Sequence, residues 1–122
     1  MLIYLKTCEI TGEGDPCNGQ IKRLKETITK IPDDNQLQDK TEIFKAISDP
    51  TRLKILYLLR DGELCVCEII DVLEKPQSTI SHHLNVLKKA GFIKGRKEGL
   101  WIHYQLTSDQ LLKLIENLSD LI

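Results

Sequence analysis

The most distinctive chemistry in this 122-residue chain belongs to its four cysteines. Cys65 and Cys67 are separated by one residue, whereas Cys8 and Cys17 lie near the N-terminus. Thiolates bind thiophilic ions such as Cd(II), Pb(II), Zn(II) or As(III), and thiols also act as redox switches. The sequence has no signal-peptide pattern and no apolar run of membrane-spanning length, so we expect a cytoplasmic protein without a membrane partner. In that compartment cysteines are reduced, metal-bound or redox-sensing more often than they form structural disulfides.

The spacing of Cys65 and Cys67 restricts how both could hold one ion. Residues i and i+2 of a regular helix point about 200° apart and cannot share a metal. Chelation therefore requires Cys65 outside a helix and Cys67 in its first turn. The apolar residues that follow fit this requirement, because their i, i+3, i+4, i+7 spacing predicts a helix beginning near Val66. The alternative is a pair of buried structural cysteines. The apolar residues are Val66, Ile69, Ile70 and Leu73.

Residues 76–91 predict a helix that could read DNA. Pro76 suits a first helical turn, and Gly91 suits a C-terminal stop. One narrow arc of this helix is apolar, and the opposite arc carries short hydrogen-bonding groups with a cation at its C-terminal end. Base edges need such donors and acceptors, although an ordinary solvated helix face would look similar. The apolar arc is Ile80, Leu84 and Leu87, and the polar arc is Ser78, Ser81, His82, Asn85 and Lys89.

A β-hairpin is predicted directly after this helix. Residues 92–97 form its first strand and Glu98-Gly99 its turn. Residues 100–106 alternate between apolar and polar side chains, as a half-buried strand does. A helix followed by a hairpin with a basic tip is the layout of a winged helix-turn-helix. We therefore predict a mainly α fold with a small β-hairpin (α+β), in which the hairpin is the wing.

The distribution of charge agrees with that layout. The whole chain has a formal net charge of −1, which argues against a general basic coat for nucleic acid. Residues 75–107, however, contain six Lys and Arg residues against one Glu, a net charge of +5. All the excess positive charge thus lies in the predicted helix and hairpin, as expected for one DNA-binding face. A dimerisation module without DNA binding would not explain this concentration of charge.

The remaining helices are predicted to build the core and a dimer interface. Apolar stripes predict helices at residues 20–30 and 39–48. Residues 50–60 are apolar on nearly all sides, which predicts a helix at the buried centre of the domain, with Asp49 as its N-cap. Thr107 to Gln110 reads as a capping box before a strongly striped last helix. We expect that last helix and the helix at 20–30 to form the interface of a homodimer. Residues 1–38 would then be an N-terminal arm with a short helix and candidate ligand cysteines, and residues 39–122 the DNA-binding and dimerisation domain.

Four of these segments resemble the ArsR family of metal-sensing bacterial and archaeal repressors. Residues 43–56, IFKAISDPTRLKIL, look like that family's opening, and residues 77–84, QSTISHHL, resemble the start of its recognition helix. Residues 90–104 match its helix end and wing, and residues 63–68, ELCVCE, match its thiolate metal box. The resemblance covers about residues 40–122. It implies a homodimeric winged-helix repressor that leaves its operator when an effector binds.

The cysteine pattern is closest to the cadmium- and lead-sensing members of that family. Arsenite-sensing members often have a third cysteine three residues after the second, where this chain has Ile70. Cadmium- and lead-sensing members add cysteines from an N-terminal extension, a role that Cys8 and Cys17 could fill here. The family's second site, made of Asp and His on the last helix, is not supported, because Asp109 is present but the helix has no histidine.

The sequence thus predicts a metal-responsive repressor that binds double-stranded operator DNA with inverted-repeat half-sites. Its effector would be a thiophilic ion on Cys65, Cys67, Cys8 and Cys17. An arsenite response, or a redox switch pairing an N-terminal cysteine with Cys65 or Cys67, remains an alternative. No nucleophile–base motif or glycine-rich phosphate loop points to an enzyme.

The predicted DNA contacts lie on the helix at 76–91 and on the wing. His82 is expected to contact DNA, whereas His83, beside the apolar arc, is expected to be partly buried. The full predicted set is Gln77, Ser78, Thr79, Ser81, His82, Asn85, Lys88, Lys89, Lys94, Arg96 and Lys97.

Overall fold

The computed structural model describes residues 16–122, which fall into two units that divide at Asp39 and Lys40. Each unit is described by itself. Within the described residues, no helix has the length and apolar character needed to cross a membrane.

The N-terminal unit contains helix α1 (Pro16–Ile28) and the start of helix α2 (Asp34–Ala46). The sequence predicted these helices to begin at Gln20 and Asp39, so both begin earlier than expected. Helix α2 begins early because Asp33 and Gln36 cap it reciprocally. The Gln36 N–H group donates to Asp33 Oδ1 at 2.9 Å, and the Asp33 N–H group donates to Gln36 Oε1 at 3.0 Å. This exchange satisfies two N–H groups that a helix start leaves without partners.

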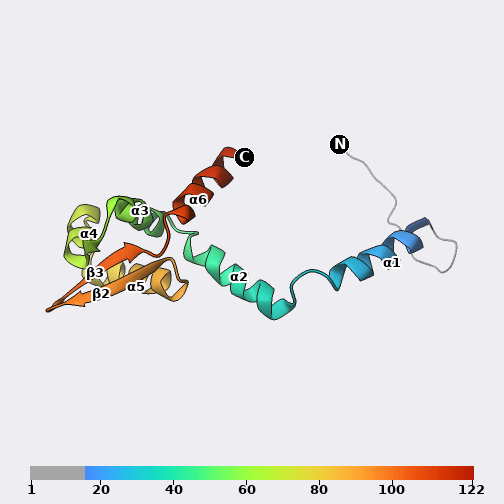
Figure 1. The fold of residues 1–122 in the computed structure, drawn as a ribbon, viewed down its shortest axis with the longest axis horizontal. Helices are drawn as coiled ribbons and strands as arrows, with labels where there is room; N and C mark the ends of the chain where they lie inside the picture. The colour runs from blue at the N-terminus through green and yellow to red at the C-terminus, as the bar shows by residue number, and fades with distance from the viewer. Residues whose placement is uncertain (1–15) are drawn as a thin grey trace. The chain divides into compact units, whose positions relative to one another are not determined.

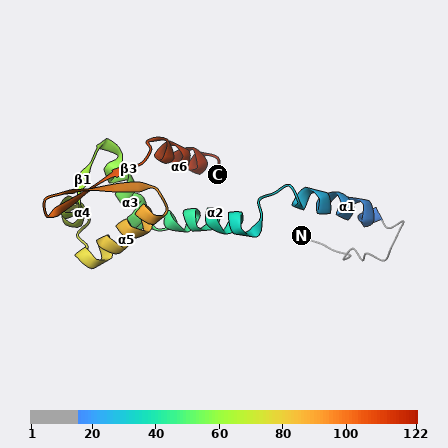
Figure 2. The ribbon, with the colours of Figure 1, turned by 60° about the horizontal axis from the view of Figure 1, so that its bottom comes forward.

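The C-terminal unit follows the order helix, helix–turn–helix, hairpin, helix. It contains α3 (Pro50–Leu58), α4 (Val66–Leu73), α5 (Gln77–Lys89), the strands β2 (Ile93–Glu98) and β3 (Trp101–Leu106), and α6 (Gln110–Asp120). Helix α3 is two residues shorter than predicted, because a 3₁₀ turn, η1 (Leu59–Asp61), replaces its last residues. Figures 1 and 2 show α3, α4 and α5 gathered beside the hairpin, whose turn lies at the opposite end of the unit from α6.

The hairpin belongs to a three-stranded antiparallel sheet with the order β1-β3-β2. The sequence predicted only the two hairpin strands. The third strand, β1 (Leu64–Cys65), is two residues long and pairs with β3 through Leu64 opposite Tyr104 and Cys65 opposite His103. This pairing attaches the start of α4 directly to the middle of the wing.

The core of the C-terminal unit forms where α3, α4, α5 and the sheet meet. Helices α4 and α5 contribute apolar residues from one stripe, as their spacing predicted, and α3 was predicted to be the buried centre because it is apolar on nearly all sides. Helix α3 is the central contributor, since Ile55 and Leu56 are completely buried. The buried core residues are Ala46, Ile55, Leu56, Leu59, Ile69, Ile80, Leu84, Leu87, Phe92, Ile93 and Leu112.

Helix α6 does not begin with the predicted capping box. The Thr107 hydroxyl donates to the carbonyl groups of Gly91 and Phe92, at 2.7 and 3.1 Å, and so ties the end of the wing to the end of α5. Ser108 takes part instead, accepting from the Gln110 N–H group at 3.2 Å. The prediction was wrong because the threonine hydroxyl is used by residues that are distant in sequence.

The N-terminus of α3 provides a test of helix capping. Asp49 is the N-cap, and its Oδ2 accepts from the Arg52 N–H group at 3.1 Å. We expect Asp49→Ala to lower the free energy of unfolding by about 1 kcal/mol, whereas Asp49→Ser, which keeps an accepting oxygen, should stay close to wild type. Urea unfolding near neutral pH measures both. Equal losses in the two variants would contradict the capping role.

The same residue predicts a pH dependence. The hydrogen bond from the Arg52 N–H group holds the pKa of the Asp49 carboxyl below its usual value. A carboxyl with a lowered pKa stabilises the fold above the pKa of the unfolded chain and loses that effect as the pH falls. The difference in stability between wild type and Asp49→Ala should therefore shrink at acid pH, as urea unfolding at each pH measures.

Candidate nucleic-acid interface and thiolate pair

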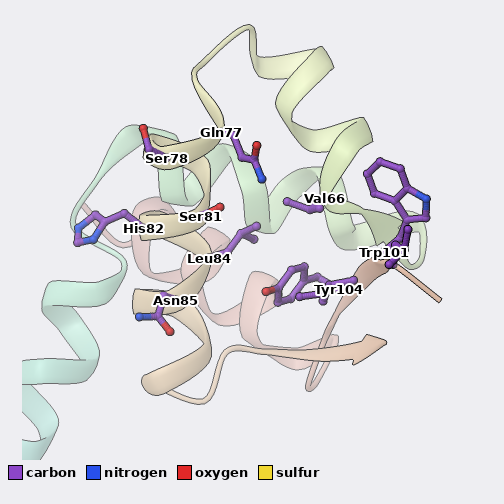
Figure 3. Close-up of a pocket in the computed structure, with 11 residues that line it drawn as sticks. Val66, Gln77, Ser78, Ser81, His82, Leu84, Asn85, Trp101 and Tyr104 are labelled. Carbon is purple, nitrogen blue, oxygen red and sulfur yellow. The ribbon is translucent and has the colours of Figure 1, made fainter. Parts of the chain in front are cut away.

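Helix α5 exposes the face that the sequence predicted to read DNA. Ile80, Leu84 and Leu87 are buried, which turns the opposite side of the helix outward. Thr79 is half-buried and therefore less available than predicted. Figure 3 shows that His82 and Asn85 project from one side of α5, whereas Gln77 and Leu84 point toward Val66 and Tyr104. The predicted residues of α5 that are exposed are Gln77, Ser78, Ser81, His82, Asn85, Lys88 and Lys89.

A groove of about 590 Å³ lies between α5 and strand β3. Its α5 wall is mostly polar, and its β3 wall is apolar and aromatic. Such a surface offers hydrogen-bonding groups on one side and contacts for a sugar or a thymine methyl group on the other. The lining residues shown in Figure 3 include Ser81, His82, Asn85, Trp101, Tyr104 and Val66.

The three predicted cations of the wing differ in their surroundings. Lys94 and Lys97 are exposed on β2. Arg96 is held by two carboxylates: its Nη2 and Nε donate to Glu63, and its Nη2 also donates to Glu98 at 3.1 Å. These contacts raise the pKa of the Arg96 guanidinium and lower the pKa of the Glu63 carboxyl. Arg96 is thus already paired within the protein, which the sequence did not reveal because Glu63 lies 33 positions away.

The two adjacent cysteines come together as the spacing argument required. Cys65 is the N-cap of α4 in an extended conformation, with φ −71° and ψ 145°, and Cys67 lies in the first turn. Their sulfur atoms are 2.6 Å apart. The Cys65 N–H group donates to Glu68 Oε1 at 2.9 Å, which fixes the backbone at this point. Cys65 is buried and Cys67 is exposed, so the pair is open to solvent from one side.

A hydrogen bond links the two sulfur atoms. The Cys67 S–H group donates to the Cys65 sulfur, and this hydrogen bond raises the pKa of the Cys67 thiol because it exists only in the protonated form. A metal ion would have to displace these protons, since thiolates rather than thiols are metal ligands.

The other two predicted ligands stay untested by the geometry. Cys17 lies in the first turn of α1, and Cys8 lies outside the described residues. Within residues 18–122, whose side chains the structure describes, no group of three or more His, Cys, Asp or Glu side chains comes together that could hold a metal. Of the four predicted ligands, Cys65 and Cys67 are the ones whose side chains are described, and they lie together.

Comparison with known proteins identifies the family. Residues 49–94 match the family described as bacterial regulatory protein, arsR family. An uncharacterised HTH-type transcriptional regulator of Methanocaldococcus jannaschii is 58% identical over 81 residues, which cover 66% of this chain and 91% of that protein. The chain belongs to the ArsR family.

Two further relatives match across most of this chain. A cadmium resistance transcriptional regulatory protein, a CadC homolog of Staphylococcus aureus, is 38% identical over 110 residues, covering 89% of this chain and 85% of that protein. The solution structure of a homodimeric winged helix-turn-helix DNA-binding domain from Mycobacterium bovis, a possible ArsR-family regulator, matches with a TM-score of 0.65 at 28% identity. That match covers 73% of this chain and 88% of the other.

These matches confirm the predicted family and fold class. The C-terminal unit of this ArsR-family chain is a winged helix-turn-helix, in which α4 and α5 form the helix-turn-helix and β2–β3 is the wing. The relatives are transcriptional regulators, so the protein is a DNA-binding regulator and not an enzyme.

The pairing of Arg96 yields a prediction about the wing. Lys97→Gln should weaken binding to duplex DNA and reduce the slope of log K against log salt by about 1, the loss of one phosphate contact. Arg96→Gln should leave the slope near wild type, because Glu63 and Glu98 already hold the guanidinium. Fluorescence anisotropy with a duplex selected by the wild-type protein from a random pool measures both, with Lys113→Gln on α6 as a control. Equal reductions in slope for both wing variants would show that Arg96 leaves its carboxylates on DNA.

Proposed function

We propose that this protein is a metal-responsive repressor that leaves its operator when a thiophilic ion binds Cys65 and Cys67. The observation that carries the proposal is the convergence of the two sulfur atoms at the N-terminus of α4, 2.6 Å apart. Helix α4 begins at the groove between α5 and the wing, since Val66, between the two cysteines, lines that groove. An ion at this pair would therefore act at the edge of the DNA-binding surface.

The geometry of the pair suits a thiophilic ion. A tetrahedral ion with metal–sulfur bonds of about 2.3 Å holds two sulfurs about 3.8 Å apart. The sulfurs need to separate by roughly 1 Å, which small rotations of the two side chains supply. Two thiolates leave positions open on such an ion, and we propose that Cys8 and Cys17 fill them. The name of the staphylococcal relative favours cadmium among the candidate ions.

We propose further that the protein acts as a homodimer on an inverted repeat. Helix α6 presents apolar side chains to solvent in the single chain, and α2 adds Ile43 and Phe44. A second copy would bury these faces, and the homodimeric state of the mycobacterial domain supports this arrangement. Two-fold symmetry then pairs two α5 helices with two half-sites. The exposed apolar side chains are Leu114 and Leu118 of α6, and Leu121 and Ile122 directly after it.

The regulatory step would pass through the short sheet. Strand β1 ends in Cys65 and pairs with β3, so a movement of Cys65 on metal binding shifts the wing relative to α5. Coupling free energies between ligand sites are typically 1–3 kcal/mol, which lowers DNA affinity about 5- to 150-fold. A DNA-binding repressor acts where the chromosome is accessible, and we therefore place the protein in the cytoplasm.

The metal response is tested by titrating Cd(II) into the reduced protein without oxygen. We expect Cys65 and Cys67 to become protected from alkylation together with the appearance of thiolate-to-metal charge-transfer absorption, and DNA affinity to fall by about 5- to 150-fold. Cys65→Ser and Cys67→Ser should each abolish the fall in affinity. Cys8→Ser and Cys17→Ser should weaken Cd(II) binding if the arm contributes ligands.

Three outcomes would refute or redirect this proposal. Equal DNA affinity with and without bound Cd(II) would refute the metal response. A fall in affinity on mild oxidation in the presence of a chelator, accompanied by a disulfide on non-reducing electrophoresis, would favour the redox switch. A response to arsenite but not to Cd(II) would keep the thiolate site and change its ion.

The dimer is tested on the apolar face of α6. Leu118→Glu should convert the dimer into a monomer near 14.0 kDa, because a carboxylate in an apolar interface loses its hydration without a partner. Lys113→Glu, an exposed charge reversal on the same helix, is the matched control and should remain dimeric. Light scattering after size exclusion gives both masses. A wild-type monomer, or a Leu118→Glu dimer, would contradict the proposed interface.

A further inference from the structure

Three helices of the C-terminal unit meet at the side chain of Arg52, which projects from α3. Its Nε donates to the carbonyl of Ala46 at 2.6 Å, and its Nη2 donates to the carbonyl of Lys45 at 3.2 Å, both at the C-terminal end of α2. Its Nη1 lies 3.0 Å from Nδ1 of His83 on α5. One guanidinium thus joins α2 and α3 to the helix that carries the candidate DNA-reading face.

The contact with His83 defines the state of the imidazole. Arg52 can only donate, because a guanidinium carries no acceptor and stays protonated in proteins. Nδ1 of His83 must therefore be the acceptor, and the ring is neutral with its proton on Nε2. A protonated His83 would present an N–H group to Nη1, so the hydrogen bond would be lost and two positive charges would face each other.

The surroundings of His83 favour that neutral form. Burial lowers the pKa of His83, and the charges of Arg52, His82 and Lys75 lower it further. Asp49 acts in the opposite direction, with Oδ2 at 3.9 Å from Nδ1. These groups come from α3, from α5 itself and from the turn before α5, and Arg52 brings in the carbonyl groups at the end of α2.

The position of His83 on α5 connects the Arg52–His83 contact with DNA binding. His83 is half-buried and follows His82, which is exposed on the polar side of α5. The fully buried side chains of α5, which are Ile80, Leu84 and Leu87, are apolar, and apolar contact has no preferred direction. A hydrogen bond does have one, so the Arg52–His83 contact can fix the rotation of α5 about its axis. That rotation decides which side chains reach the bases.

We propose that Arg52, acting through neutral His83, is a positioning residue that holds the recognition helix α5 in its DNA-reading orientation. This inference rests on the DNA-binding function of the ArsR family and is independent of the metal response. Arg52 touches no base or phosphate in this role. Loss of the contact reduces the affinity for specific DNA and leaves the number of phosphate contacts unchanged.

Substitutions of His83 and Arg52 test the hydrogen bond directly. The probe is a labelled duplex that the wild-type protein selects from a random-sequence pool. His83→Leu, which removes the acceptor, should lower affinity about ten-fold, the effect of losing one hydrogen bond to a charged group. His83→Gln, whose amide oxygen can accept from Nη1, should stay within about two-fold. Arg52→Lys keeps the charge but not the fork of donors, and should behave like His83→Leu.

A salt series separates positioning from a phosphate contact. A positioning residue leaves the slope of log K against log salt unchanged, whereas a lost phosphate contact reduces it by about 1. Lys54→Gln, an exposed cation on the same helix α3, is the matched control for loss of charge. Thermal unfolding of each variant gives the folded fraction, and His83→Gln and His83→Leu decide the matter if Arg52→Lys does not fold.

DNA affinity measured over a pH series distinguishes the proposed hydrogen bond from simple packing, because packing alone would not make affinity depend on the protonation of His83. Protonation of an exposed histidine near DNA strengthens binding, so the comparison uses a His82→Gln background. In that background affinity should fall as the pH drops from about 7.5 to about 5, because His83 becomes protonated. The His82→Gln/His83→Gln double variant should lose this fall. His103, near Glu63 and Glu98, is present in both proteins and cancels in the comparison.

Three results would overturn the proposal. Wild-type affinity in His83→Leu would show that the contact does not position α5. A salt slope lowered by about 1 in Arg52→Lys or His83→Leu would assign the loss to a phosphate contact. An undiminished fall in affinity at low pH in the double variant would show that His83 is not the titrating group. Failure of the wild-type protein to select any duplex would instead refute DNA binding itself.

Discussion

The burial of one side of helix α5 is the constraint on which the rest of the structure depends. Ile80 and Leu87 are completely buried and Leu84 is 1% exposed, and each such side chain contributes about 1.5–3 kcal/mol relative to leaving it in water. These residues belong to the same core as Ile55 and Leu56 of α3. Because that side must face inward, the polar side must face outward, and the candidate DNA-reading surface is a consequence of core packing.

A second constraint is the two-residue strand β1. Its pairing with β3 holds Cys65 in an extended conformation, and the chain turns into α4 at the next residue. At such a junction side chains at i and i+2 can come together, whereas within a helix they point about 200° apart. The thiolate pair therefore depends on the sheet as much as on the cysteines. The same junction brings Val66 to the edge of the groove.

The sequence predicted the features that local periodicity determines. The start of α4 at Val66, the buried and exposed sides of α5, the hairpin and the N-cap at Asp49 all follow from residues within one or two turns of each other. The reciprocal cap of Asp33 and Gln36 could have been found in the same way, and it would have placed the start of α2 correctly.

Features that join distant segments escaped prediction. Strand β1 has only two residues and no alternation to detect, so nothing local distinguishes it from a loop. Arg96 looked like a DNA-binding cation because its partner Glu63 comes from another strand region, and His83 looked like simple packing because its partner Arg52 is 31 positions away. The Thr107 hydroxyl donates to a carbonyl group between α5 and the wing, and it does not cap helix α6. For Arg96, His83 and Thr107, a polar side chain bonds to a partner that is distant in sequence.

The ion pairs of Arg96 reduce the positive charge that residues 75–107 can offer to DNA phosphates. The formal charge of residues 75–107 is +5, but one of these cations is shared between Glu63 and Glu98 and is not free to neutralise phosphate. Affinity from charge alone is thus smaller than the composition suggests, and the orientation of α5 and the wing matters more.

Glu63 stands two residues before Cys65, so Arg96 ties the wing to the segment that carries the thiolate pair. A displacement at Cys65 would reach the wing by two routes, through the β1–β3 hydrogen bonds and through this ion pair. The completely buried residues of α3 do not need to move for that to happen. A displacement at Cys65 can therefore change the arrangement of the DNA-binding elements without repacking the core.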